Sequence, residues 1–190
     1  MNYIVMDLEF NQPYDFAEGP KSILVEECPF EIIQIGVVKL DQQFNQIKTG
    51  NFLAKPQVYT RIHPHVERIT QLTIERLEDQ PYFPEAFQNL INFIGNEPYI
   101  FCIWGSSDLK LLHKNIYYHQ LDGGSLSTEV INVQELAARY LKQPRGLCIG
   151  LKKAVEALSL PLWESLQFHD ALHDAMYTAE ILKKIAYPYG

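Results

Sequence analysis

Apolar and polar residues follow a strand-like pattern in the first third of the chain. Near-continuous apolar residues predict buried strands over residues 3–8 and 31–40. Residues 44–53 are expected to return antiparallel to the second strand across a turn at 41–43. Between the first two strands, residues 11–30 are rich in proline and polar residues and are expected to form a long loop. The pattern predicts a three-stranded antiparallel meander.

The rest of the chain alternates between helical and strand patterns. Two further strands are expected over residues 99–104 and 130–133. Helical spacing predicts one helix capped by Ser106 and Ser107, and others over residues 73–78, 84–94, 134–141, 150–158 and 170–186. The predicted fold class is therefore α/β, with a central five-stranded mixed sheet flanked by helices on both faces.

The length and composition indicate the number of domains and the overall charge of the protein. The 190 residues, 47% of them apolar, predict one globular domain over residues 1–190. A net charge of -7 argues against a broad basic surface for long nucleic acid, but it suits a carboxylate site that binds metal ions. The three cysteines are expected to be reduced, with Cys102 in the core. Because neither a signal peptide nor a membrane span is visible, we expect a cytoplasmic location and no membrane partner.

Three acidic residues lie at or just after the ends of predicted strands. Asp7 and Glu9 are two residues apart, so their side chains project from one face of the first strand. Asp108 falls in the first turn of a helix directly after the fourth strand. A solvated strand end and a favourable helix dipole would explain these positions without any function. Alternatively, strand ends that meet at one edge of the sheet would bring all three carboxylates to one site.

The segment His169-Asp170-Ala171-Leu172-His173-Asp174 offers two competing pairs. His169 and His173 have the spacing of a helical metal pair, but helical periodicity places His173 on the polar face, where we expect it to be solvated. Asp174 lies beside the apolar stripe, where an acid without a partner is costly to bury. With Asp170 near the helix N-cap, His169 is free to lean toward Asp174. A histidine with its usual pKa of about 6.5 suits a general base.

The three motifs D-x-E, W-G-x-x-D and H-x-x-x-x-D together resemble the DEDDh branch of the DEDD exonuclease superfamily. The resemblance covers nearly the whole chain, including the segments Glu31-Ile-Ile-Gln-Ile-Gly and Gly150-Leu-Lys-Lys-Ala. Within the superfamily, Asp-Leu-Glu-Phe and the long loop after it look most similar to the RNA-trimming exonucleases and related stand-alone bacterial enzymes.

This resemblance implies a ribonuclease H-like fold and a 3'-5' exonuclease. The expected reaction releases nucleoside 5'-monophosphates from the 3' end of single-stranded RNA or DNA, using two Mg²⁺ or Mn²⁺ ions. Asp7, Glu9, Asp108 and Asp174 would bind the metals, with Asp7 bridging them, and His169 would be the general base. A homodimer, or a place as a subunit of a larger assembly, is also implied.

Phe10 and Asn11, which follow the acid pair, are expected to contact the substrate. An aromatic ring at position 10 could stack on the terminal base. The sequence departs from the family at Asp170, since a basic residue often follows the histidine there.

Three alternatives stay open. The chain could be a nucleic-acid-binding module with weak catalysis, although all four acids and His169 are present. It could also hydrolyse dinucleotides or other small phosphodiesters. The third alternative, a zinc hydrolase using His63, His65, His169 and His173, is weakened because His63-Pro64-His65 is expected to be a loop.

Overall fold

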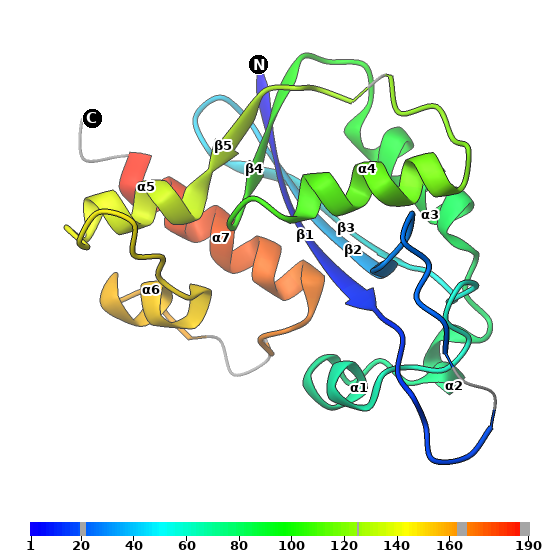
Figure 1. Ribbon diagram of the computed structural model, residues 1–190. Coiled ribbons are helices and arrows are strands. Elements are labelled where there is room, and N and C mark those ends of the chain that lie inside the picture. The colour runs from blue at the N-terminus through cyan, green and yellow to red at the C-terminus, as the bar shows by residue number, and fades with distance from the viewer. Residues whose placement is uncertain (20–21, 125, 163–166, 187–190) are drawn as a thin grey trace.

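Five strands form one mixed sheet in the computed structural model, which describes residues 1–19, 22–124, 126–162 and 167–186 (Figure 1). The strand order is β3-β2-β1-β4-β5. The antiparallel meander consists of β1 (Asn2–Asn11), β2 (Glu31–Leu40) and β3 (Gln46–Leu53). β4 (Tyr99–Ile103) runs parallel to β1, and β5 (Val130–Asn132) runs parallel to β4. The predicted fold class is confirmed.

Helices cover both faces of this sheet (Figure 1). One face packs against α3 (Phe83–Ile94) and α4 (Asp108–Tyr118). The other packs against α5 (Val133–Tyr140), α6 (Leu151–Ala157) and α7 (Ala171–Ala186). Two short helices, α1 (Pro64–Thr70) and α2 (Ile74–Leu77), form a smaller core with Ile33 of β2.

The alternation of β1 decides which face carries the acid pair. Ile4, Met6 and Leu8 point into the core with α3 and α4, whereas Val5 points into the core with α7. Because successive side chains of a strand alternate between faces, Asp7 and Glu9 lie on the side of α7.

Two local expectations were wrong. The segment His63-Pro64-His65, expected as a loop, begins helix α1: proline occupies the first turn, and the His63 ring accepts a hydrogen bond from the His65 N–H. Proline suits this position because its φ is already helical and its missing N–H would have no helical partner. Ser107 is the N-cap residue of α4, but its hydroxyl donates to the Asp108 carboxylate (3.2 Å) and forms no capping bond.

The long loop after β1 packs against residues 57–61. The Tyr59 hydroxyl donates to the Cys28 carbonyl (2.9 Å) and accepts from the Val25 N–H (3.1 Å). The Arg61 guanidinium lies 3.5 Å from the ring centroid of Phe16. These contacts hold the described part of the loop on the protein; residues 20–21 lie outside the described residues.

All three cysteines are free, as expected. Cys28 and Cys102 are buried, and Cys148 is exposed. None of the helices in the described residues has the length and apolar character needed to cross a bilayer.

Gly36 allows α7 to approach the sheet. A Cβ atom at this position would lie 2.0 Å from the Ala171 carbonyl carbon and 2.1 Å from the Leu172 nitrogen, which are both backbone atoms. Gly36 is also the residue that pairs with Asp7 across β1 and β2. The missing side chain therefore brings the first turn of α7 next to the acid pair.

We expect Gly36→Ala to lower the free energy of unfolding by about 3 kcal/mol or more, because overpacking against backbone cannot be relieved by a rotamer change. Gly150→Ala is the matched control, since a Cβ at Gly150 meets nothing within 4 Å. The control should change the free energy of unfolding by less than about 1 kcal/mol. Urea unfolding followed by circular dichroism measures both, and equal effects would contradict the packing argument.

Candidate active site

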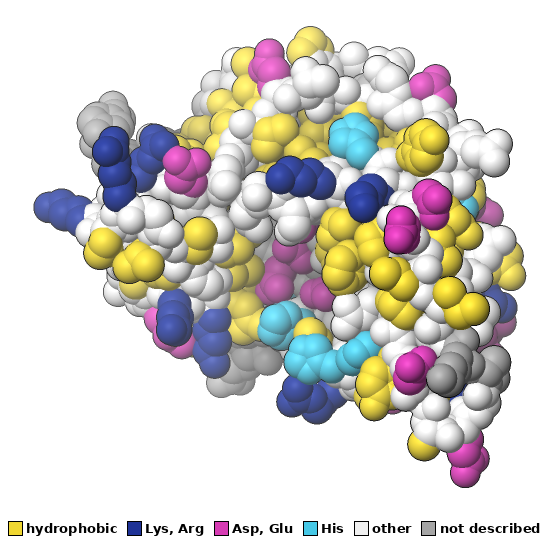
Figure 2. Space-filling model, in the orientation of Figure 1, with side chains coloured by type: hydrophobic (Ala, Val, Ile, Leu, Met, Phe, Trp, Pro, Cys, Tyr) yellow, Lys and Arg dark blue, Asp and Glu magenta, His cyan; other side chains and the backbone are white. Residues whose placement is uncertain are grey.

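Four carboxylates converge at one end of the sheet. Asp7 and Glu9 come from β1, Asp108 from the first turn of α4, and Asp174 from the first turn of α7. The Asp108 carboxylate accepts a hydrogen bond from the Leu8 N–H, between the two β1 acids. Figure 2 shows acidic side chains gathered in a hollow, with histidine side chains along its edge. The structure thus brings together the four acids that the sequence motifs had indicated.

The electrostatics of this cluster are unfavourable to four negative charges. Burial, followed by the charges of Asp108, Asp174 and Glu9, raises the pKa of Asp7 well above its usual value. Burial is also the largest cause for the other three: the pKa rises to about 8 for Glu9, about 7 for Asp174 and about 6 for Asp108. Desolvation and like-charge repulsion both favour the protonated form. A cation bound among these groups would offset the repulsion and favour the ionised carboxylates.

His169 lies at the edge of the same cluster. Its backbone has a left-handed φ of 65°, and its N–H donates to Asp174 Oδ2 (3.1 Å). Potential ligand atoms of Glu9, His169 and Asp174 all lie within 4.8 Å of one another. Burial of part of the ring, and then the neighbouring His65, lower the pKa of His169. The ring is therefore neutral at neutral pH and stands beside the carboxylates.

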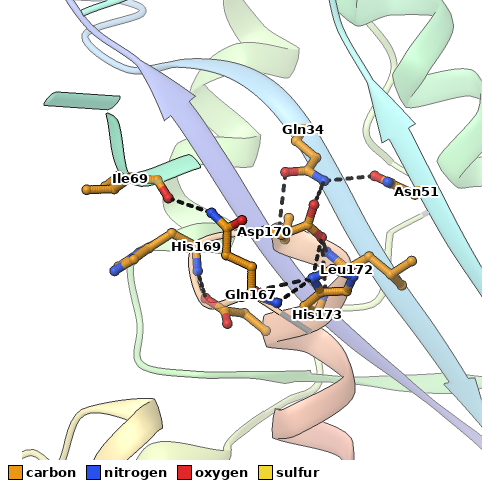
Figure 3. A network of polar contacts seen from close by, with 10 residues as sticks. Gln34, Asn51, Ile69, Gln167, His169, Asp170, Leu172 and His173 are labelled. Atoms are coloured by element: carbon orange, nitrogen blue, oxygen red, sulfur yellow. Dashed lines mark hydrogen bonds and ion pairs between the residues drawn. The ribbon is translucent and has the colours of Figure 1, made fainter. Parts of the chain in front are cut away.

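A polar network joins the start of α7 to β2 (Figure 3). The Asp170 carboxylate caps the helix by accepting from the N–H groups of Leu172 (3.1 Å) and His173 (3.2 Å). The Gln34 side chain donates to Asp170 (3.1 Å) and accepts from the Ala171 N–H (3.1 Å). Asp170, whose charge looked out of place in the sequence, is therefore engaged in capping and in contact with β2.

His173 is partly buried, and the expectation that it is solvated was wrong. Its Nδ1 accepts from the Gln167 N–H (3.1 Å), and the Gln167 side chain donates to the Ile69 carbonyl of α1 (3.2 Å) (Figure 3). These bonds fasten the turn that carries His169 to both α1 and α7. Within the described residues, only Glu9, His169 and Asp174 have the mutual spacing of metal ligands, so the four-histidine zinc site has no geometric support.

Asn11, expected to contact the substrate, is completely buried. Its Nδ2 donates to the carbonyls of Tyr59 (2.8 Å) and Arg61 (3.0 Å), and its Oδ1 accepts from the His63 N–H (2.9 Å). Because the side chain is enclosed and bonded, it holds the segment before α1 and offers no atom to a substrate. Phe10 is half-buried, so part of its ring is accessible.

Sequence reasoning did not single out Gln34 and Gln167, which position the site. Gln34 had a detectable signal, because it is the one polar side chain within residues 32–38 of β2. Gln167 had none, since a glutamine next to a helix start is unremarkable in a sequence.

The donor set fits hard divalent cations. Asp174 Oδ1 is buried and has no hydrogen-bond partner in the described structure, so it is free to bind an ion. Carboxylate oxygens are the ligands that Mg²⁺ and Mn²⁺ prefer. The fold and this site define a class: an α/β domain with a mixed five-stranded sheet and a carboxylate and histidine centre suited to divalent cations.

A comparison with known protein families also assigns the chain to a family. The model of the RNase T exonuclease family matches residues 4–182, so the chain belongs to this exonuclease family. No curated protein matches the sequence.

Solved structures share the fold at low sequence identity. The nuclease domain of 3'hExo, described as a DEDDh family member bound to rAMP, has a TM-score of 0.80 and 19% identity, covering 97% of this chain and 91% of that one. Cell-death related nuclease 4 has a TM-score of 0.74 and 18% identity, covering 97% and 63%. Exonuclease I has a TM-score of 0.71 and 16% identity, covering 97% and 40%. This chain spans 62% of the 3'-exonuclease whose structure shows recognition of the histone mRNA stem-loop.

The raised carboxylate pKa values predict how stability depends on pH. Folding raises the pKa of Glu9 from 4.5 to about 8 and that of Asp174 from 3.8 to about 7. Between pH of about 4 and about 8, the two carboxyl groups keep their protons in the folded protein but lose them in the unfolded chain. The free energy of unfolding of the metal-free protein should therefore fall as pH rises through this range.

Thermal unfolding in EDTA should therefore show a Tm that falls between pH 5 and pH 8. Added Mn²⁺ should raise the Tm more at pH 8 than at pH 5, because protons compete with the ion for the carboxylates. Glu9→Gln should flatten the pH dependence. A metal-free Tm that rises over this range would show that the acids are not clustered.

Proposed function

We propose that this protein removes nucleoside 5'-monophosphates one at a time from the 3' end of single-stranded nucleic acid, with residues 1–190 acting as one exonuclease domain. The observation that carries the proposal is the convergence of Asp7, Glu9, Asp108 and Asp174 on one hollow with His169 at its edge. We favour RNA as the substrate, because structures that share the fold were solved with rAMP and with a histone mRNA stem-loop.

The four carboxylates are proposed to hold two divalent ions, Mg²⁺ or Mn²⁺. Bound there, such ions supply Lewis acidity: they lower the pKa of water and offset the negative charge that develops on the phosphate. Asp7 is proposed as the shared ligand, because the charges of Glu9, Asp108 and Asp174 all act on it. Four carboxylates and two divalent ions leave the site near neutrality, so a phosphodiester can enter.

His169 is proposed to accept the proton of the attacking water through its ring. Its lowered pKa keeps the ring neutral near pH 7, which is the form that a general base needs. The hydrogen bond from its N–H to Asp174 fixes the turn beside the carboxylates (3.1 Å).

Phe10 is proposed to contact the terminal base. Its ring packs edge-on against Phe30, with the centroids 6.4 Å apart, and remains only half-buried. An aromatic face that is fixed by a neighbour can stack on any base without selecting its identity.

The direct test is incubation of 5'-labelled single-stranded RNA and DNA with Mn²⁺ or Mg²⁺. We expect a ladder that shortens from the 3' end. EDTA and Asp7→Asn should both abolish it, because the variant loses the shared ligand. Isothermal titration with Mn²⁺ should show weakened metal binding for Asp7→Asn.

Lys55→Gln is the control and should leave the ladder unchanged, because the Lys55 ammonium donates to the Glu78 carbonyl (2.8 Å) and is not one of the clustered groups. Intact oligonucleotides with metal demonstrably bound would contradict the proposal, and would turn attention to small phosphodiesters or to binding without cleavage.

His169→Ala should reduce kcat by about 10²- to 10⁴-fold, the usual contribution of a positioned general base. Metal binding should remain, because the four carboxylates are intact. For the wild-type protein, the rate should rise with pH through the pKa of His169 and then level. A variant with near wild-type kcat in a single-turnover assay would exclude His169 as the base.

Phe10→Ala should weaken oligonucleotide binding by about 1 to 3 kcal/mol, which is the usual value of one stacked base. Phe10→Tyr retains the ring and should bind normally. Fluorescence anisotropy measures both affinities, and an unchanged affinity for Phe10→Ala would disprove the stacking contact.

A further inference from the structure

Positive charge is concentrated in one segment of an acidic protein. Residues 136–155 contain five of the 16 basic residues and no acidic residue, whereas the whole chain has a net charge of -7. The five, all exposed, are Arg139, Lys142, Arg145, Lys152 and Lys153. They lie at the end of α5, in the following loop and at the start of α6, and we call residues 136–153 the basic lobe.

The basic lobe also has a concave and partly apolar surface. A cavity of about 690 Å³ lies between α5 and the loop, lined by Arg139, Arg145 and Leu147 among others. Leu147 and Tyr140 are exposed by 58% and 44%, so apolar side chains stand among the charges. Cations for phosphates, interleaved with flat or apolar groups for bases, are what single-stranded nucleic acid requires.

Two contacts connect the basic lobe to the active site. On one side, Gln134, which precedes the basic lobe and lines its cavity, donates to the Ile149 carbonyl of the lobe (2.9 Å). The same side chain lies beside Gly105, in the turn that leads to Asp108, because a Cβ atom on Gly105 would be 3.6 Å from Gln134 Oε1. On the other side, the Lys152 ammonium lies 6.0 Å from the ring centroid of Phe168, the residue before His169. Figure 2 shows Lys and Arg side chains on the side of the molecule where Figure 1 shows α5 and α6, beside the acidic hollow.

We propose that the basic lobe binds the part of a single-stranded nucleic acid that lies upstream of the 3' end being cleaved. This inference rests on the proposed function for the identity of the ligand. The carboxylates of the acidic hollow would repel the phosphates of a nucleic-acid strand. The positive side chains of the basic lobe, next to the hollow, would attract those phosphates. Arg139 forms an ion pair with Glu135, so Lys142, Arg145 and Lys152 are the cations chosen for testing.

The first test compares two triple variants by fluorescence anisotropy in EDTA, where no strand is cleaved. One replaces Lys142, Arg145 and Lys152 by Gln. The matched control replaces Lys48 of β3, Lys55 just after β3 and Arg76 of α2 by Gln. Both variants remove two Lys and one Arg, so their net charge is the same. For a 12-nucleotide RNA or DNA, we expect the Kd of the first variant to rise about tenfold and the slope of log K against log salt to fall by about 2. The control should change the Kd less than twofold.

The second test uses the wild-type protein. Cys148 lines the cavity and is exposed, whereas Cys28 and Cys102 are buried, so a thiol reagent should label Cys148 first. A bound 12-mer should slow this labelling at least threefold, and a dinucleotide should not.

Equal Kd values for the two variants, no binding by the wild type, or no protection of Cys148 would each overturn the proposal. Because neither test needs catalysis, a protein that binds strands through the basic lobe but cuts none would refute the proposed exonuclease reaction and leave this inference standing.

Discussion

Helix α7 lies so close to strand β2 that only a glycine fits between them. Gly36 faces the backbone of Ala171 at a distance that excludes any side chain, and its partner across the strands is Asp7. The rest of the site depends on this contact. It places Asp174 and the turn of His169 opposite the β1 acids, and Gln34 and Asp170 then fix the angle at which the helix begins.

The same closeness has an electrostatic cost. Four carboxylates in a mostly buried hollow raise one another's pKa, and burial is the largest cause at each of them. The surrounding apolar packing of the sheet and helices must offset this destabilisation in the metal-free protein. In the proposed function these same carboxylates would bind the metal ions, so a bound cation would offset the repulsion that destabilises the metal-free protein.

Charge is also sorted in space. The clustered carboxylates lie in the hollow, and the basic lobe lies beside it on α5, the following loop and α6. The net charge does not reveal this arrangement, because -7 is the sum over the whole chain and regions of opposite sign partly cancel in it. An acidic chain can therefore have a local surface suited to phosphates, and its overall charge restricts only how broad that surface is.

The sequence by itself determined the order of strands and helices, the shared face of Asp7 and Glu9, and the unusual position of Asp174, since each follows from a local period of two or 3.6 residues. The motifs then indicated which acids belong together. Only the tertiary structure decided that Asn11 is enclosed, that His173 binds Gln167, and that Gln34 holds the start of α7. Local periodicity tells which way a side chain points, but the partner of a polar group comes from a segment far away in the chain, and that segment is placed only when the whole core packs.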